Sequence, residues 1–190
     1  MTEDLLTICI LTLDDRAEYY NRLRQCLDSQ VANHPVRIVT VRDNYEKSIG
    51  AKRNQAVQAV QTPYLCFIDD DDLVSTEYIR TIIEELRKSP DAVGLRGIVT
   101  QDHGKPQYFI NSLGYKWEAK PRLIKGNITY LRPVNHLNPI RTEIALRYPY
   151  QEINHAEDMD YANRLLEGGD VKVCPLIDKV MYFYQYRSKK

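Results

Sequence analysis

The sequence lacks an excess of charge of either sign and a long hydrophobic run. Its 26 Lys and Arg residues balance its 26 Asp and Glu residues, so no overall basic field is present to hold nucleic acid non-specifically. No apolar run approaches the roughly 20 residues that a membrane-spanning helix needs. Acidic residues precede the first apolar run, unlike the start of a signal peptide. We therefore expect a cytoplasmic protein without a transmembrane segment that does not bind nucleic acid.

The sequence also lacks closely spaced cysteines. Its four cysteines are far apart, and no CxxC motif occurs. Structural zinc sites usually contain such closely spaced ligand pairs. Three of the cysteines lie within apolar runs, where Cys behaves as a small hydrophobic residue. The pattern therefore argues against a zinc site and favours a reducing compartment.

The first half of the chain alternates between apolar runs of strand length and segments with helical patterns. The expected strands are residues 5–13, 36–41, 64–68 and 92–100. The expected helices follow Asp14 or Asp15, span about 46–61, and run from Ser75 to Pro90. Such alternation predicts a parallel sheet with helices on both faces.

The second half of the chain has a different pattern. Short segments with Gly and Pro predict hairpins or loops over residues 101–135. Helices are expected around 142–147 and 156–167, and strands at 171–175 and 179–187. A chain of 190 residues suits one domain. The sequence thus predicts a single α/β domain with a mostly parallel central sheet and a smaller mixed C-terminal part.

Four consecutive aspartates, Asp69–Asp72, directly follow the expected strand 64–68. Adjacent carboxylates repel one another unless a cation or protons neutralise them. Ligands bind at the carboxyl ends of strands in open α/β sheets, and Mg²⁺ takes one or two carboxylates together with substrate phosphates. The cluster indicates a site for a divalent cation and a diphosphate. The alternative is a solvated acidic turn in which Asp72 or Ser75 caps the next helix.

Two basic residues lie near the start of the second expected helix. Gly50 permits the close approach of a backbone or a ligand, and Lys52 and Arg53 have donors suited to phosphate oxygens. The only acid near them in the sequence is Glu46. Together with the aspartates, this pattern favours contact with phosphate over an ordinary solvated helix face.

The last expected helix begins with two carboxylates. Asn154 and Glu157 have the spacing of a capping box, with Glu157 reaching back to the helix start. A helical wheel at about 100° per residue places Glu157 on the polar side and turns Asp158 toward the core. An inward carboxylate faces either a pocket or a large desolvation cost. Asp158 is therefore predicted to be a general base, unless it only bonds the free N–H groups of the first turn.

Several other residues have two interpretations each. Asp43 follows the second strand and either accepts a hydrogen bond from a base or ribose or holds a turn. His136 and His155 either contact an acceptor or donor sugar or have structural roles. The tyrosines of the last strand, followed by Arg187, either form a membrane-surface or sugar-stacking strip or occupy one face of a strand. These are Tyr182, Tyr184 and Tyr186.

In this order, these pieces resemble the family 2 glycosyltransferases with a GT-A fold. The similar pieces are LTICILTLDDR, the strand-end Asp43, GAKRNQAV, CFIDDDDL and EDMDYANRLLEGG. The resemblance implies an inverting transfer of a sugar from a nucleoside-diphosphate sugar, by default a UDP-sugar, to a glycan or other hydroxyl acceptor. Residues of about 1–100 would bind the nucleotide sugar, and residues of about 101–190 the acceptor.

The resemblance also implies a role for each site residue. Asp71 would hold Mn²⁺ or Mg²⁺, Asp69 would meet the ribose with Asp70 nearby, and Asp158 would be the general base. Lys52 and Arg53 would lie near the diphosphate or brace the aspartates. The nucleoside pocket would contain Thr12, Asp14, Arg16 and Asp43, and candidates for acceptor or sugar contact are His136, His155 and Glu157.

Two alternatives remain open from the sequence. A sugar nucleotidyltransferase would use similar acidic metal ligands, but it should have a Gly-rich basic loop directly after the first strand, where LDDR stands instead. A non-catalytic nucleotide-sugar-binding module is the other alternative, and the presence of both Asp71 and Asp158 argues against it.

Overall fold

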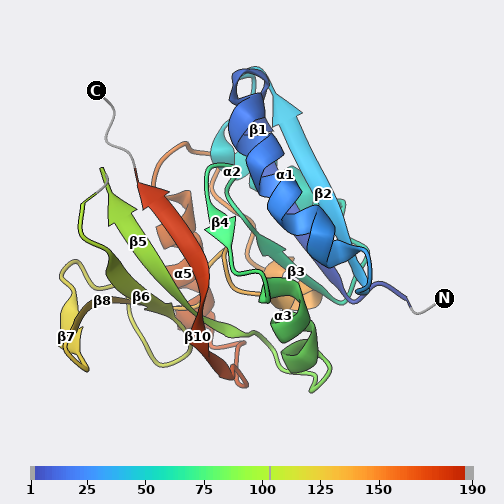
Figure 1. Ribbon diagram of the computed structural model, residues 1–190. Helices are drawn as coiled ribbons and strands as arrows, with labels where there is room; N and C mark the ends of the chain where they lie inside the picture. Colours follow the sequence, from blue (N-terminus) through green and yellow to red (C-terminus); the bar gives the residue numbers. More distant parts are fainter. Residues whose placement is uncertain (1–2, 103, 187–190) are drawn as a thin grey trace.

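The structure is a computed structural model that describes residues 3–102 and 104–186, and it contains two β-sheets (Figure 1). The first has the strand order β2-β1-β3-β9, in which β1, β2 and β3 are parallel and β9 is antiparallel to β3. Its strands are β1 (Leu6–Leu13), β2 (Val36–Asp43), β3 (Tyr64–Phe67) and β9 (Ile140–Arg141). The parallel sheet predicted for the first half is confirmed for its first three strands, but the expected strand 92–100 lies in the second sheet.

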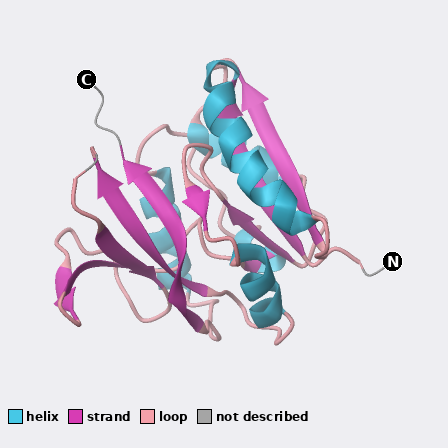
Figure 2. Ribbon diagram, in the orientation of Figure 1, coloured by secondary structure: helices cyan, strands magenta, loops and turns pink. Residues whose placement is uncertain are grey.

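Helices cover both faces of this sheet. Ile8 and Ile10 of β1 belong to one core with α1 and α3, while Cys9 and Leu11 belong to a second core with α2 and α5. In Figure 2, α1 lies in front of the four-stranded sheet and α5 behind the six-stranded one. The helices are α1 (Ala17–Val31) after a 3₁₀ turn (Asp14–Arg16), α2 (Ile49–Gln58), α3 (Tyr78–Leu86), α4 (Thr142–Ala145) and α5 (Glu157–Gly168). Because successive side chains of a strand point to opposite faces, a continuous apolar run such as β1 fills both cores.

The second sheet is mixed and has the strand order β4-β10-β5-β6-β8-β7. Its strands are β4 (Leu73–Val74), β5 (Gly94–Gln101), β6 (Gln107–Asn111), β7 (Arg122–Ile124), β8 (Asn127–Arg132) and β10 (Leu176–Tyr186). The last strand, β10, lies between β4 and β5, antiparallel to β4 and parallel to β5. This pairing brings the end of the described chain beside the acidic turn that precedes β4. The expected mixed part is confirmed, and it has more strands than the parallel sheet.

Some predicted boundaries differ from the structure. The second helix begins at Ile49 rather than near residue 46, because the Ser48 hydroxyl caps it by accepting a hydrogen bond from the Ala51 N–H (3.2 Å). The expected strand at 171–175 is wrong. Two backbone N–H groups of this segment, those of Lys172 and Val173, donate to the Asp91 carboxylate instead of to a neighbouring strand.

Other expectations have mixed outcomes. The third helix begins at Tyr78, and the Ser75 hydroxyl accepts a hydrogen bond from the Glu77 N–H in the turn before it. Arg187 lies outside the described residues.

All four cysteines are free, and burial raises the pKa of the Cys66 thiol to about 12, as expected for a cysteine that acts as a core residue. Within residues 3–102 and 104–186, no helix is both long and apolar enough to span a bilayer.

Candidate active site

The four aspartates lie at the carboxyl end of β3, as predicted, but folding gives them different environments. Asp70 and Asp72 are buried, with 4% and 0% of their surface exposed. Asp70 accepts hydrogen bonds from the Thr12 hydroxyl (2.7 Å) and from Arg16 Nη2 (2.6 Å). Asp72 accepts from the Tyr182 hydroxyl (2.8 Å) and from a backbone N–H of β10. Protein donors therefore engage both carboxylates and hold the acidic turn in place.

Asp69 and Asp71 remain accessible, and about a third of each side chain is exposed. Asp71 is 3.0 Å from Arg16 Nη2. Burial raises the pKa of Asp71, and although Arg16 lowers it, the charges of Asp69 and Asp70 add to the rise. Burial alone would raise the pKa of Asp69 as well, but the charge of Arg53 and the contact with His136 hold it well below the ordinary value. These two carboxylates are the ones that can face a ligand.

The residues of this turn fit a divalent cation that shares its ligands with a substrate. Within the described ranges, no three His, Cys, Asp or Glu side chains gather into a cage that could hold a metal by themselves. Mg²⁺ commonly binds to one or two carboxylates and completes its coordination with water and substrate phosphates. Asp71, with Asp69 nearby, meets that requirement, and a cation would relieve the mutual repulsion that raises the Asp71 pKa.

The raised pKa of Asp72 leads to a prediction about stability. Burial is its main cause and the charge of Asp69 adds to it, so the folded protein binds this proton well above the usual pKa of 3.8. The native state then holds more protons than the unfolded state, so the stability contributed by this group is full at low pH and is lost as pH rises from about 4 through the raised pKa. Asp72→Asn should remove this loss, because an amide has no charge to bury.

Urea unfolding in EDTA at about pH 5 and about pH 8 measures this effect. Between the two values, wild type should lose at least about 1 kcal/mol more stability than Asp72→Asn, the free energy of roughly one pKa unit. The control is Asp28→Asn, an exposed change on α1 that should follow wild type. Equal losses in wild type and Asp72→Asn would contradict the prediction.

The basic residues of α2 are buried and paired. Lys52 Nζ is 2.8 Å from the Asp43 carboxylate, and Arg53 Nε is 3.2 Å from Glu157. The expectation that only Glu46 lies near them is wrong, because the fold brings carboxylates from β2 and α5 to the helix. Asp43 also accepts a hydrogen bond from the Lys47 N–H, a contact of the kind that holds a turn. Lys52 Nζ contacts one carboxylate oxygen of Asp43 and the Lys47 N–H the other, so both oxygens have partners within the protein.

Gly50 permits a close approach, but the partner is the chain itself. A Cβ atom at this position would lie 1.7 Å from the backbone oxygen of Gln151, and the Gly50 N–H donates to the Ile153 carbonyl (3.1 Å). The absence of a side chain at Gly50 therefore lets the segment before α5, which contains Gln151 and Ile153, pack against α2. This packing explains how residues about 100 positions apart in the sequence share one site.

Arg53 lies at the centre of the site. Its guanidinium group lies over the Phe67 ring at 4.9 Å, and it contacts Asp69 (3.4 Å) as well as Glu157. Its Nη1 atom is buried and has no hydrogen-bond partner among the described residues. Arg53 therefore braces the first aspartate, one of the two roles suggested by the resemblance, and keeps one donor unsatisfied.

The predicted capping box at α5 is wrong. The residue before the helix is Ala156, in a left-handed conformation (φ 63°), and no side chain caps it. The Asn154 side chain instead accepts a hydrogen bond from the Ile49 N–H (3.0 Å), so it caps α2. Glu157 is buried against Arg53 rather than on the polar side, because an inward-facing arginine makes that part of the core polar. Asp158 is about 30% exposed and faces His136.

His136 connects the two ends of the site. Its Nε2 atom is 3.5 Å from Asp69 and its Nδ1 atom 3.9 Å from Asp158, and its side chain is only 7% exposed. Neither ring nitrogen has a hydrogen-bond partner within the described part of the chain. Buried polar atoms are nearly always satisfied by protein, water or ligand. His136 and Arg53 thus mark a place where water or a polar ligand can bind. His155 and Asp14 are exposed.

The tyrosines of β10 contribute more than the sequence indicated. The Tyr182 hydroxyl donates to Asp72 and accepts from the Asp69 N–H (3.2 Å). Burial raises the pKa of Tyr184, two residues further along β10, and the charges of Asp69 and Asp158 add to the rise. The period-two spacing correctly indicated one face of a strand. The sequence could not indicate that this face lies against the acidic turn.

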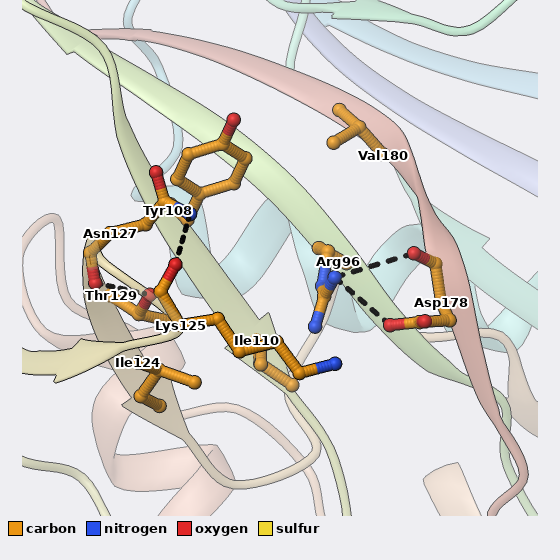
Figure 3. Close-up of a pocket in the computed structure, with 9 residues that line it drawn as sticks. All are labelled: Arg96, Tyr108, Ile110, Ile124, Lys125, Asn127, Thr129, Asp178 and Val180. Atoms are coloured by element: carbon orange, nitrogen blue, oxygen red, sulfur yellow. Dashed lines mark hydrogen bonds and ion pairs between the residues drawn. The ribbon is translucent and has the colours of Figure 1, made fainter.

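A separate groove of about 270 Å³ lies on the opposite face of the six-stranded sheet (Figure 3). Its lining includes Arg96, which pairs with Asp178 (2.9 Å), and Tyr108. A bulge in β10 puts Val180 on the groove face and Tyr182 on the active-site face, because the register with β5 shifts between them. None of the predicted site residues lines this groove.

A parallel β-sheet with an acidic turn at its carboxyl edge, joined to a second mixed sheet, defines the chain as an α/β protein with the GT-A fold of glycosyltransferases. A family model described as glycosyl transferase family 2 matches residues 8–144, and the chain belongs to this family of enzymes.

Solved structures of TarS from S. aureus are similar to this chain. TarS residues 1–349 in complex with UDP-GlcNAc match with a TM-score of 0.67 and 13% identity, covering 98% of this chain and 60% of that one. The complex with UDP matches with a TM-score of 0.65 and 14% identity, covering 95% and 60%. The chain thus spans 60% of that TarS fragment, and at this identity the likeness concerns the fold. A comparison with curated proteins finds no significant match.

Proposed function

We propose that this chain is a metal-assisted, inverting glycosyltransferase that moves a sugar from a nucleoside-diphosphate sugar, by default a UDP-sugar, to an acceptor hydroxyl. The observation that carries the proposal is the convergence of two accessible carboxylates with unsatisfied donors. Asp69 and Asp71 face outward at the end of β3, and the buried, unpartnered nitrogens of Arg53 and His136 lie beside Asp69. The UDP-GlcNAc and UDP complexes of TarS support the choice of donor.

The proposed roles are those that the resemblance to family 2 glycosyltransferases implies, and the geometry of the site supports them. Asp71 would bind Mn²⁺ or Mg²⁺, which when present neutralises charge on the departing nucleoside diphosphate. Asp69 would contact the ribose, and Arg53 would hold the Asp69 carboxylate in place. Arg16 bridges Asp70 and Asp71 and fixes their spacing. Thr12 acts through Asp70, because its hydroxyl is already donated to that carboxylate.

The transfer itself would be a single displacement. The acceptor oxygen forms a bond to the anomeric carbon as the bond from that carbon to the diphosphate oxygen breaks, which inverts the configuration. The acceptor proton passes to the Asp158 carboxylate, and the electron pair of the broken bond leaves with the diphosphate. Asp158 suits this role because it is partly exposed at the start of α5 and lies 3.9 Å from His136, whose other ring nitrogen is 3.5 Å from Asp69.

Metal dependence tests the proposal directly. UDP binding, measured by calorimetry, should weaken at least about tenfold in EDTA and recover with Mn²⁺ or Mg²⁺, because a cation held by Asp71 would neutralise charge on the diphosphate. Asp71→Asn should bind weakly with or without added metal. The exposed variant Asp28→Asn should respond to metal as wild type does. Undiminished UDP binding in EDTA would refute a metal at Asp71.

A further inference from the structure

A second cluster lies on the active-site face of the six-stranded sheet. Tyr130 and Arg132 of β8 point to the same face, because they are two residues apart on one strand. Tyr130 is paired with Phe109 in the sheet, and the Phe109 ring packs edge-on against the Tyr182 ring at 6.2 Å. Since the Tyr182 hydroxyl bonds Asp72, this face continues from the acidic turn to Arg132.

Arg132 is held in a fixed position by its neighbours. Its guanidinium group lies over the Trp117 ring at 4.7 Å and over the Tyr130 ring at 5.2 Å. Its Nη1 atom donates to the backbone carbonyls of Leu131 (3.0 Å) and Glu118. Stacking on aromatic faces leaves the edge of the guanidinium plane free for bidentate contacts. Nε and Nη2 make no hydrogen bond within the described part of the chain.

Arg132 forms no ion pair with a carboxylate of the described residues, although the charges of Glu118 and Asp158 act on it. Arg16 and Arg53 each have a carboxylate within 3.4 Å, whereas no carboxylate among residues 3–102 and 104–186 forms an ion pair with Arg132. Arg132 is half-buried, and this burial lowers its pKa; the charges of Glu118 and Asp158 oppose the change only in part. A half-buried guanidinium group that forms no ion pair within the described residues can bind an anion from outside.

Resting on the proposed transfer to an acceptor hydroxyl, we propose that Arg132, positioned by Trp117 and Tyr130, binds an anionic group of the acceptor. The group would be the carboxylate or phosphate of a charged sugar, whose ring could lie near the aromatic side chains. Arg132 is paired in the sheet with Asn111, whose side chain donates to Asn135, the residue before His136. His136 in turn contacts Asp158, so an anion held at Arg132 would place a neighbouring hydroxyl on the side of the site where the base lies. The inference assigns a substrate class, acidic glycans, to the acceptor side of the site.

Ligand binding at this subsite can be measured by the fluorescence of Trp117, because it is the single tryptophan of the chain. Its fluorescence can be titrated with three methyl glycosides that share one ring: the glucoside, the glucuronide and the glucoside 6-phosphate. Titrations run both with and without UDP and Mn²⁺, so that acceptor binding is measured even if the donor does not bind. Inorganic phosphate and acetate test whether the anion alone is enough.

The charged glycosides should bind about 10- to 100-fold more tightly than the neutral one, the scale of one charge-assisted hydrogen bond. Arg132→Gln should abolish this preference, and Arg132→Lys should keep part of it. The control Arg37→Gln, on β2 and paired with Asp4, should keep all of it. The comparison between glucuronide and phosphate identifies the preferred anion.

The outcomes separate this inference from the proposed function. Equal binding of the neutral and charged glycosides, or a preference that survives in a folded Arg132→Gln, overturns the role of Arg132 while UDP binding can remain intact. Failure of UDP to bind wild type refutes the donor site instead. If inorganic phosphate competes as well as the sugar phosphate, the site recognises an anion without its sugar, and the assignment of an acidic glycan is wrong.

Discussion

Replacing Asp158 with Asn is expected to reduce sugar transfer by about 10²- to 10⁴-fold, the usual contribution of general-base catalysis. The amide keeps the size of the side chain but cannot accept the acceptor proton. Asp158 forms no ion pair with Lys or Arg among residues 3–102 and 104–186, and its carboxylate is 3.9 Å from His136 Nδ1. UDP affinity and the free energy of unfolding should therefore change little, and the loss should appear in the transfer rate at saturating donor and metal.

A matched control for this variant lies on the same helix. Asp160 pairs with Arg164 (2.7 Å) and accepts a hydrogen bond from Gln151 (2.9 Å), both away from His136. Asp160→Asn should transfer at nearly the wild-type rate. If Asp158→Asn also retains most of its activity, the base lies elsewhere, and His136 is the next residue to replace because it is between Asp158 and Asp69.

Glu157→Ala should destabilise the protein by about 3–5 kcal/mol, the usual cost of removing one partner from a buried ion pair. Arg53 would retain only Asp69, at 3.4 Å, and remain almost completely buried. Such a loss is a large share of the roughly 5–15 kcal/mol that stabilises a typical domain. Urea unfolding monitored by circular dichroism measures the effect, with the exposed Glu167→Ala on the same helix as control.

A double variant distinguishes the buried charge from simple loss of packing. Arg53→Met combined with Glu157→Leu removes both charges and restores apolar volume, so much of the lost stability should return. UDP binding should not return with it, because Asp69 would lose its brace. A destabilisation below about 1 kcal/mol in Glu157→Ala would show that Arg53 is satisfied without this partner.

Local sequence patterns were sufficient for much of the fold. The continuous apolar runs of β1 and β3 had to be covered on both faces, and the structure shows helices on each side. Asp69–Asp72 could be placed at the carboxyl end of a strand because the apolar run stops there. These features depend on neighbouring residues, whose burial and backbone preferences act over a few positions.

The helix α5 shows where such reasoning fails. A helical wheel assumes that apolar residues face the core, so it put Glu157 on the outside. The face that points inward meets Arg53, which is 104 positions away in the sequence. The side on which a carboxylate belongs depends on this partner, and no local pattern contains that information.

The sequence by itself determined the class of fold, the family and the position of the acidic turn. Only the tertiary structure decided which aspartates are buried and which stay partly exposed. Four chemically identical neighbours separate into two that are buried against Thr12, Arg16 and Tyr182 and two whose side chains remain about a third exposed. Their partners come from β1, the turn after it and β10, up to about 110 residues away. Because burial and hydrogen bonding set the free energy of each carboxylate, this division arises only when the distant strands pack against the turn.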